Sequence, residues 1–485
     1  MNSSVLLTGD LPASTLHDRV RRGTLVRLAS GIYAGPDDDL DAVVHRSWRE
    51  IVAHKFPGAV VTDRSALWAG PHDGYLFIAS ARTGSLSLPG LTVVSRKGPA
   101  DVDHDIAIGA GVKVASRPRA LLDNTRLTRK RGDRPSATLA RTELADWVDH
   151  LCAIESAASV ESYRAKAETL APLLGASYER VEVLNEIVGA ALGTRTATFG
   201  SRAMAARSMG RPYDQRRLVR LELLADYLRD IVATHPALPL DAGHRRTLPF
   251  WEAYFSNFIE GTEFTPEEAA GIVFDGDIPR ARPQDAHDVL ATYQLVSNDA
   301  EMRRRSASAD EFVEVLSDWH RIIMGGRPEM RPGEFKNHQH QAGGTTFVAP
   351  DLVRGTLERG YSLLNSLHTP TQRGTFVAFL VAEVHPFDDG NGRLARAVMN
   401  SEFVAGEEQR AIVPTISRND YLRALRRLTR QDRPDLFVAM LDRVRRWTAK
   451  VDWTSLATAT AHLEATNAFV DSNDAEDRGL HLLDP

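Results

Sequence analysis

The run His385-Pro-Phe-Asp-Asp-Gly-Asn-Gly-Arg-Leu-Ala-Arg396 constrains the fold of this chain more than any other segment. The residues before it, 375–384, carry apolar side chains at the three- and four-residue spacing of a buried helix. Pro386 cannot continue that helix, so we expect the helix to end at His385. Arg393 and Arg396 then share one face of a second helix. The run therefore predicts a helix–loop–helix with a glycine-rich loop.

Two side chains of the run have the chemistry of a reacting centre. His385 is the only group in it that titrates near neutral pH, which makes it the candidate general base. Asp389 is a hard oxygen ligand, suited to a Mg²⁺ ion that bridges phosphates. Both residues suit chemistry on a phosphate group.

The remaining polar groups of the run suit the phosphate itself. Gly390, Asn391 and Gly392 can point successive N–H groups inward as an anion-binding nest, and the next helix adds its positive dipole end. Arg393 and Arg396 can grip phosphate oxygens with bidentate donors. A helix–helix turn with solvated charges would explain any single piece, but all the pieces at this spacing favour a nucleotide-phosphate site. The sequence has no Walker-type phosphate loop, so this nest is its one evident phosphate site.

The run resembles the signature of the Fic family (filamentation induced by cAMP), His-Pro-Phe-x-Asp/Glu-Gly-Asn-Gly-Arg-x-x-Arg, and matches it at every position. The resemblance implies a helical core that transfers AMP from ATP and Mg²⁺ to a Ser, Thr or Tyr hydroxyl of a target protein or of itself. It implies that His385 deprotonates the hydroxyl, Phe387 packs inward to hold the loop, and Asp389 binds Mg²⁺. It assigns the phosphates to Gly390, Asn391, Gly392, Arg393 and Arg396. Weaker likeness covers about residues 215–450.

A second segment is similar to the inhibitory helix of Fic proteins, which carries Ser/Thr-x-x-x-Glu-Gly/Asn. Ser256 and Glu260 are four residues apart, hence on one face of a helix that Gly261 would end. The resemblance implies that Glu260 pairs with Arg396 and occupies the space of the γ-phosphate, so that the enzyme inhibits itself. The alternatives are a surface glutamate on an amphipathic helix and a glutamate that helps to remove AMP.

Residues 334–350 contain Gly343-Gly344 between extended segments, which predicts a β-hairpin. The resemblance identifies this hairpin as a flap that holds the target segment by strand addition. Lys336 stands where the family commonly has an arginine. His338 and His340 share one face of a strand, as in some metal sites, but the neighbouring sequence offers no evident third ligand.

The N-terminal residues predict a short helix over 11–23 and a hairpin over 25–34 with Gly31 at its turn. This order is typical of a winged helix, and it resembles the amino-terminal region of AbiEi-type antitoxins. The resemblance implies contact with duplex DNA through four arginines, Arg19, Arg21, Arg22 and Arg27. Acidic residues 37–39 follow directly, and the first fifty residues hold seven acidic against six basic side chains. A protein-docking module is therefore the alternative.

Changes in composition and periodicity along the chain, together with the two resemblances, predict five regions. The first two are a winged-helix-like region over residues 1–55 and an AbiEi-like regulatory region over 56–195, which is α/β and then helical. A linker over 196–215 leads to a Fic domain over 216–455, with its inhibitory helix around 250–261, and a C-terminal helix with a frayed acidic tail covers 456–485. The expected fold class is mainly α, an all-helical Fic core with a β-hairpin flap preceded by an α/β winged-helix-type region.

Composition agrees with a soluble, multidomain, cytoplasmic protein. The chain is 43% hydrophobic and 25% charged, and its net charge of -5 gives no global attraction to nucleic acid or membrane. Its one cysteine excludes an intramolecular disulfide, and the first residues lack the basic region of a signal peptide. We expect a protein adenylyltransferase; the alternatives are a DNA-binding regulator with the Fic core as nucleotide sensor, and a Fic enzyme that transfers another nucleotide or removes AMP.

Overall fold

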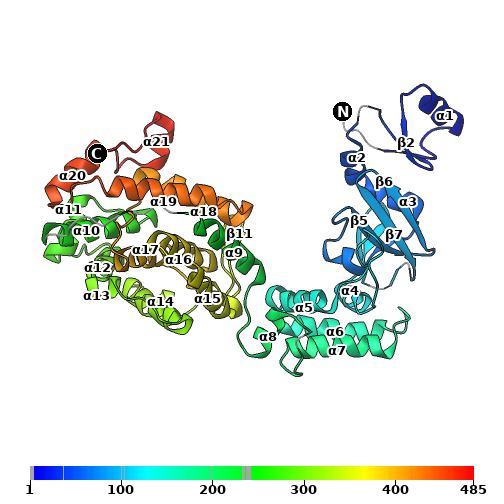
Figure 1. The fold of residues 1–485 in the computed structure, drawn as a ribbon, viewed down its shortest axis with the longest axis horizontal. Coiled ribbons are helices and arrows are strands. Elements are labelled where there is room, and N and C mark those ends of the chain that lie inside the picture. Colours follow the sequence, from blue (N-terminus) through cyan, green and yellow to red (C-terminus); the bar gives the residue numbers. More distant parts are fainter. Residues whose placement is uncertain are drawn as a thin grey trace. The chain divides into compact units, whose positions relative to one another are not determined.

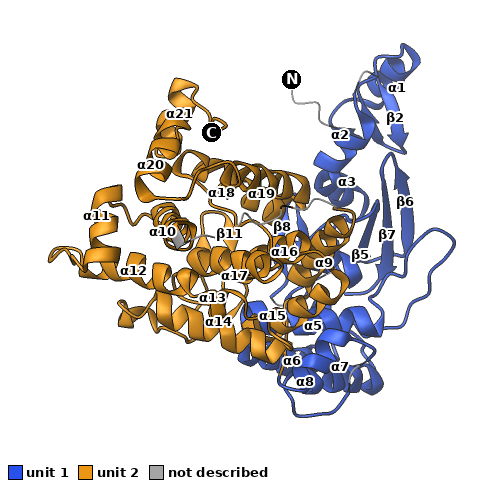
Figure 2. Ribbon diagram, turned by 60° about the vertical axis from the view of Figure 1, so that its left-hand side comes forward, with its two compact units in different colours: residues 1–210 blue, residues 211–485 orange. Residues whose placement is uncertain are grey.

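A computed structural model of the chain describes residues 5–485 except 37, 100, 103, 198, 232–234 and 236–241. The chain divides into two compact units, residues 1–210 and 211–485, which Figure 2 colours separately. The first unit combines small sheets with helices, and the second is helical apart from one short hairpin. The predicted fold class is thus confirmed. None of the described helices is both long and apolar enough to cross a membrane.

The first unit begins with a small antiparallel sheet and one helix. Strands β1 (Leu6–Leu7), β2 (Val26–Ala29) and β3 (Ile32–Ala34) lie in the order β1-β3-β2, and α1 (Ala13–Arg21) connects β1 to β2. The predicted hairpin turns at Gly31, whose φ of 73° is a conformation that favours glycine. The four predicted DNA contacts are exposed on and beside α1 and on β2: Arg19, Arg21, Arg22 and Arg27. The winged-helix assignment and the DNA contact stay predictions, and Asp37 of the acidic run lies outside the described residues.

A six-stranded mixed sheet follows, in the order β6-β7-β5-β4-β9-β8, with β5–β7 and β4–β9 parallel and the other pairs antiparallel. Its strands are β4 (Val60–Val61), β5 (Tyr75–Ser80), β6 (Gly84–Leu88), β7 (Leu91–Lys97), β8 (Ile106–Gly109) and β9 (Val112–Val114). One apolar core joins this sheet to helices α2 (Leu40–Arg46), α3 (Trp48–Lys55), α4 (Arg117–Asn124), α5 (Arg141–Glu155), α6 (Ala157–Leu170) and α7 (Tyr178–Ala191). Along the chain the sheet and helices α2–α4 precede helices α5–α7. The regional boundaries within this unit stay predictions.

The predicted linker over 196–215 contains a helix instead of an exposed connection. Helix α8 (Arg202–Ser208) begins at Ser201, whose hydroxyl accepts a hydrogen bond from the Met204 N–H. Ala203, Met204 and Ala206 are buried in the first unit. The small apolar side chains between the arginines of this segment give the helix a face to bury, so the segment packs within the first unit, which ends at residue 210.

The second unit is built from helices around a central pair, α16 (Pro370–Val384) and α17 (Asn391–Ala405), which lie side by side (Figure 1). Most residues of both helices are buried. The surrounding helices are α9 (Gln215–Arg229), α10 (Ala242–Ile259), α11 (Pro266–Ala270), α12 (Pro283–Ser297), α13 (Asp299–Met302), α14 (Ala309–Ile323), α15 (Val353–Ser362), α18 (Arg418–Gln431), α19 (Pro434–Thr448), α20 (Leu456–Ala465) and α21 (Ser472–Arg478). The helix–loop–helix that the sequence predicts is therefore the core of this unit.

The acidic tail, which we expected to fray, forms α21. Asp471 caps this helix by accepting hydrogen bonds from the N–H groups of Asn473 and Asp474. Gly479 ends it in the left-handed conformation, and Ala475 is buried. Asp471 therefore caps the helix, and Asp474 places a negative charge in its first turn, where the helix dipole stabilises it.

Candidate active site

The loop between α16 and α17 starts and ends on left-handed residues. His385 caps α16 with φ 53° and ψ 62°, which turns the chain at the predicted point. Gly390 precedes α17 with φ 73°. Asn391 and Gly392 already belong to the helix, so Gly390 alone of the two loop glycines needs glycine's backbone freedom. Gly392 instead leaves room for the Glu260 carboxylate, because a methyl group there would overlap Glu260 Oε1 in its present position.

Asn391 and Phe387 brace the loop. The Asn391 side chain accepts a hydrogen bond from the Phe387 N–H and donates one to the Phe387 C=O, both at 2.9 Å. The Phe387 ring is fully buried and stacks on His320, with 3.8 Å between ring centroids. The inward packing expected for Phe387 is therefore present. Because both polar ends of the Asn391 side chain are engaged, its backbone N–H at the start of α17 is the group of this residue that would be available to an anion.

His320 joins the loop to its surroundings. Its Nδ1 accepts the Gly333 N–H at 2.8 Å, so Nε2 carries the ring proton and donates to the Asp389 C=O at 3.0 Å. Burial lowers the pKa of His320 to about 4, and the ring is neutral near pH 7. We did not predict this residue from the sequence. Its signal is a histidine among the apolar residues on the buried face of α14, which is an amphipathic helix.

The candidate base His385 lies under the flap. The Phe347 ring stacks on the His385 ring, with 3.9 Å between centroids and 12° between planes. The Lys336 ammonium donates to the Val384 C=O at 3.3 Å, one residue before His385. Burial, together with the charge of Lys336, lowers the pKa of His385 to about 3. Burial and the charge of Arg217 lower the pKa of Lys336 to about 7. The imidazole is therefore neutral at physiological pH, and burial beside Lys336 makes it a weaker base than a free imidazole.

The flap is the predicted β-hairpin, although each strand is short. Strands β10 (Gln341–Ala342) and β11 (Thr345–Thr346) pair antiparallel around Gly343, which has φ 56°. The Phe347 N–H extends the ladder by donating to the His340 C=O at 3.0 Å. The hairpin thus places Phe347 on His385.

The two arginines of α17 have different surroundings. Arg396 donates through Nε to the Ser256 hydroxyl at 3.0 Å, and through Nη2 to the Ser256 C=O at 2.8 Å. The same Nη2 contacts Glu260 Oε1 at 2.7 Å. The Arg396 side chain is only 5% exposed, whereas that of Glu260 is 30% exposed. Both residues of the predicted inhibitory segment therefore meet the second arginine of the run.

The α10 helix ends at Ile259, one residue earlier than the sequence predicts, so Glu260 lies just beyond its last turn. Gly261 follows with φ 90°. The Glu260 carboxylate reaches the first turn of α17 at Gly392. An internal anion therefore occupies the place where a helix N-terminus and an arginine both favour negative charge.

Arg393 is fixed by a buried carboxylate. Its Nη1 lies 2.7 Å from Asp288 Oδ2, and both side chains are almost fully buried. Arg327 Nε shares the same oxygen at 2.9 Å. Arg393 Nη2 faces Asp389 Oδ2 at 3.4 Å, towards the loop. We did not predict Asp288 from the sequence; its signal is an acidic residue at a buried position of α12.

The loop residues fit a magnesium-bound nucleotide. Asp389 keeps 46% of its side chain exposed, so its carboxylate can reach an ion that also holds phosphates and water. The first turn of α17 offers N–H groups that no helical carbonyl takes. Arg393 Nε is buried and has no hydrogen-bond partner among the described residues. These donors suit an anion, and the Glu260 carboxylate already lies against the first turn of α17 at Gly392.

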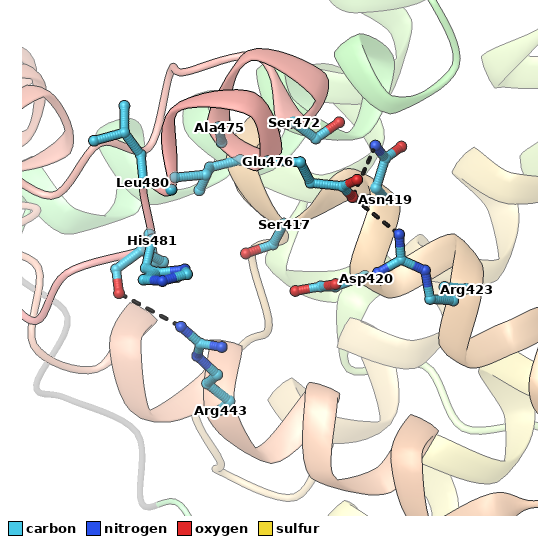
Figure 3. Close-up of a pocket in the computed structure, with 13 residues that line it drawn as sticks. Ser417, Asn419, Asp420, Arg423, Arg443, Ser472, Ala475, Glu476, Leu480 and His481 are labelled. Carbon is cyan, nitrogen blue, oxygen red and sulfur yellow. Dashed lines mark hydrogen bonds and ion pairs between the residues drawn. The ribbon is translucent and has the colours of Figure 1, made fainter.

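A separate pocket of about 170 Å³ lies where the start of α18 meets α19 and α21 (Figure 3). Asn419 and Arg423 both donate hydrogen bonds to the Glu476 carboxylate in its lining. Its lining includes no residue of the motif loop. We therefore place the chemistry at the loop and not in this pocket.

Comparison with known proteins identifies the motif. Residues 312–402, from α14 through the loop into α17, match the model of the Fic/DOC family. The chain contains a Fic domain. The matched residues begin after Glu260, so the family model covers neither Glu260 nor the first unit.

Curated relatives of the Fic domain carry an activity in their name. Protein adenylyltransferase Fic of Drosophila erecta is 27% identical over 221 residues, which is 44% of this chain and 43% of the relative. The protein of the same name in Drosophila melanogaster is 25% identical over 221 residues, 44% of this chain and 43% of the relative. This chain therefore spans less than half the length of these relatives.

Solved Fic structures also align with the chain. Fic-1 from C. elegans aligns with 68% of this chain and 89% of its own, at 16% identity and a TM-score of 0.37. A Fic domain containing signaling protein from Bacteroides thetaiotaomicron aligns with 52% of this chain and 97% of its own, at 17% identity and a TM-score of 0.37.

Proposed function

We propose that this Fic domain transfers AMP from ATP to a Ser, Thr or Tyr hydroxyl of a protein, and that Glu260 inhibits the transfer. One observation carries the proposal. The Glu260 carboxylate lies between Arg396 and the first turn of α17, in a cradle that favours an anion. A nucleotide phosphate has the charge and the oxygen atoms for the same place.

In this reaction the target oxygen forms a bond to the α-phosphorus of ATP. The bond between that phosphorus and its bridging oxygen breaks, and pyrophosphate leaves. The neutral His385 imidazole, which caps the end of α16 beside the loop, takes the proton of the hydroxyl. The N–H groups of α17 and its two arginines stabilise the phosphate charge. Mg²⁺, held by Asp389, would neutralise further charge on the phosphates.

Regulation follows from the two partners available to Arg396. A phosphate can use this guanidinium fully only when the Glu260 carboxylate gives it up, because Glu260 already binds its Nη2 group. The Ser256 hydroxyl accepts a hydrogen bond from Arg396 Nε, and the Ser256 C=O accepts one from Nη2. These bonds keep Arg396 in place while the phosphate replaces Glu260. Glu260 therefore competes with the nucleotide without unfolding the site.

The test is to incubate the Glu260→Gly protein with ATP labelled at the α-phosphate, Mg²⁺ and lysate of the source organism. Label on the protein itself or on a lysate protein supports the transfer. The same label in a Glu260→Gly/His385→Ala double variant would falsify the role of His385. Labelled UTP, GTP and CTP, run beside ATP, show whether another nucleotide is preferred.

The principal alternative is a DNA-binding regulator in which the Fic domain only senses a nucleotide. The exposed arginines on and beside α1 and on β2 are the observation that favours it. Such a protein would bind ATP without labelling any protein. It would also be retained on duplex DNA with steep salt dependence, and replacing Arg19, Arg21 and Arg22 by alanine would abolish the retention.

A further inference from the structure

Two histidines of the flap meet a carboxylate of the catalytic loop. His338 and His340 precede β10, and their Nε2 atoms lie 3.0 Å apart. His340 Nε2 lies 3.2 Å from Asp388 Oδ1, and His338 Nδ1 lies 3.8 Å from the same oxygen. One ligand atom from each residue lies within 4.8 Å of the others. The fold thus supplies the third ligand that the sequence around the two histidines did not offer.

Asp388 turns one carboxylate oxygen towards the two histidines. Arg331 holds the other oxygen, Oδ2, through Nε at 2.9 Å and Nη2 at 2.7 Å. Oδ1 is buried, and His340 Nε2 faces it at 3.2 Å. A buried carboxylate oxygen is stabilised by a donor or by a cation that faces it. The two imidazoles and this oxygen converge on one place, where a cation could bind all three.

We propose that His338, His340 and Asp388 bind one divalent transition-metal ion of the zinc type. Two imidazole nitrogens and one carboxylate oxygen are the donor set of an open zinc site, which keeps one position for water. Mg²⁺ and Ca²⁺ prefer oxygen ligands and would not select this set. The three ligand atoms need to separate by a few tenths of an ångström to surround an ion, and the His338 side chain, which is 65% exposed, is free to turn.

This ion would fasten the flap to the catalytic loop. Asp388 lies between Phe387 and the magnesium ligand Asp389, while the histidines precede the hairpin that carries Phe347 onto His385. Metal binding would therefore hold the hairpin over the base. The site uses none of the groups assigned to the nucleotide, so it can exist whether or not the domain transfers AMP.

The test is a titration of the full-length protein, free of any histidine tag, with Co²⁺. Co²⁺ in a mixed nitrogen–oxygen site of low coordination number gives visible absorption, and Zn²⁺ should displace it. We expect saturation at one equivalent. Binding should weaken roughly tenfold or more in His338→Ala, His340→Ala and Asp388→Asn. The exposed His481→Ala variant is the histidine control and should bind as the parent does.

A matched pair of carboxylate variants separates the two metal sites. Asp388→Asn should abolish the Co²⁺ absorption, whereas the neighbouring Asp389→Asn should leave it unchanged. Loss in Asp389→Asn together with retention in Asp388→Asn would overturn the proposal, as would no absorption change in the parent. His338→Ala changes an exposed side chain, so a folding defect cannot explain a loss there. Hydrogen exchange gives a second readout: residues 341–347 should exchange more slowly with Zn²⁺ in the parent and at an unchanged rate in His338→Ala.

Discussion

Replacing Glu260 by glycine is expected to raise the initial rate of AMP transfer by about 10- to 100-fold. The carboxylate makes one charge-assisted hydrogen bond of 2.7 Å to Arg396, which is 5% exposed. A hydrogen bond to a charged group contributes about 1.5–3 kcal/mol, and about 1.4 kcal/mol corresponds to tenfold in an equilibrium constant. Removing the carboxylate therefore shifts the competition for Arg396 towards the phosphate by this factor.

The rate is measured as label from α-phosphate-labelled ATP incorporated per minute, under conditions where ATP does not saturate the parent. Glu263→Gly is the matched control, because Glu263 is an exposed carboxylate three residues further along. Circular dichroism verifies that both variants fold. An unchanged rate in Glu260→Gly, or an equal increase in Glu263→Gly, would refute the reasoning.

Three further predictions concern the loop and its supports. Asn391→Ala removes two buried hydrogen bonds to Phe387, so the free energy of unfolding in urea should fall by about 2–3 kcal/mol; no loss would contradict the bracing role. His320 takes up its proton near pH 6.5 when unfolded and near pH 4 when folded, so acidification from pH 7 to pH 5 should cost about 2 kcal/mol of stability. His320→Gln should flatten this pH dependence, and an equal slope in both proteins would count against it. Lys336→Met removes a positive charge beside His385, so an NMR titration should find the pKa of His385 above its value of about 3; an unchanged pKa would exclude the coupling.

The helix–loop–helix could be predicted from the sequence because its signals are local. Pro386 and Gly390 set where α16 ends and α17 begins. The end of α16 lies where the sequence indicates, whereas α17 already includes Asn391 and Gly392, which the sequence assigns to the loop. The pairing of Glu260 with Arg396 came from resemblance to a family, since more than a hundred residues separate them and no periodicity connects them.

The supports of the site could not be predicted, because they depend on which helix faces meet. Asp288 and His320 lie on α12 and α14, outside any motif, and only the fold brings them to the loop. Asp388 occupies the variable position of the signature, so nothing in the sequence marks it as a partner of His340. The polar and acidic composition of the tail predicts fraying, but the hydrogen bonds that Asp471 accepts at the start of α21 stabilise a helix there.

The central claim is that His385 directs transfer of the α-phosphoryl nucleotide, and double labelling of ATP tests it most directly. Glu260→Gly protein is incubated with ATP labelled at the α-phosphate in one reaction and at the γ-phosphate in another, and acid-precipitated protein is counted. We predict that protein retains the α label but not the γ label, and that His385→Ala in the same background abolishes the α label. Retention of the γ label, or α label that persists without His385, would contradict the account.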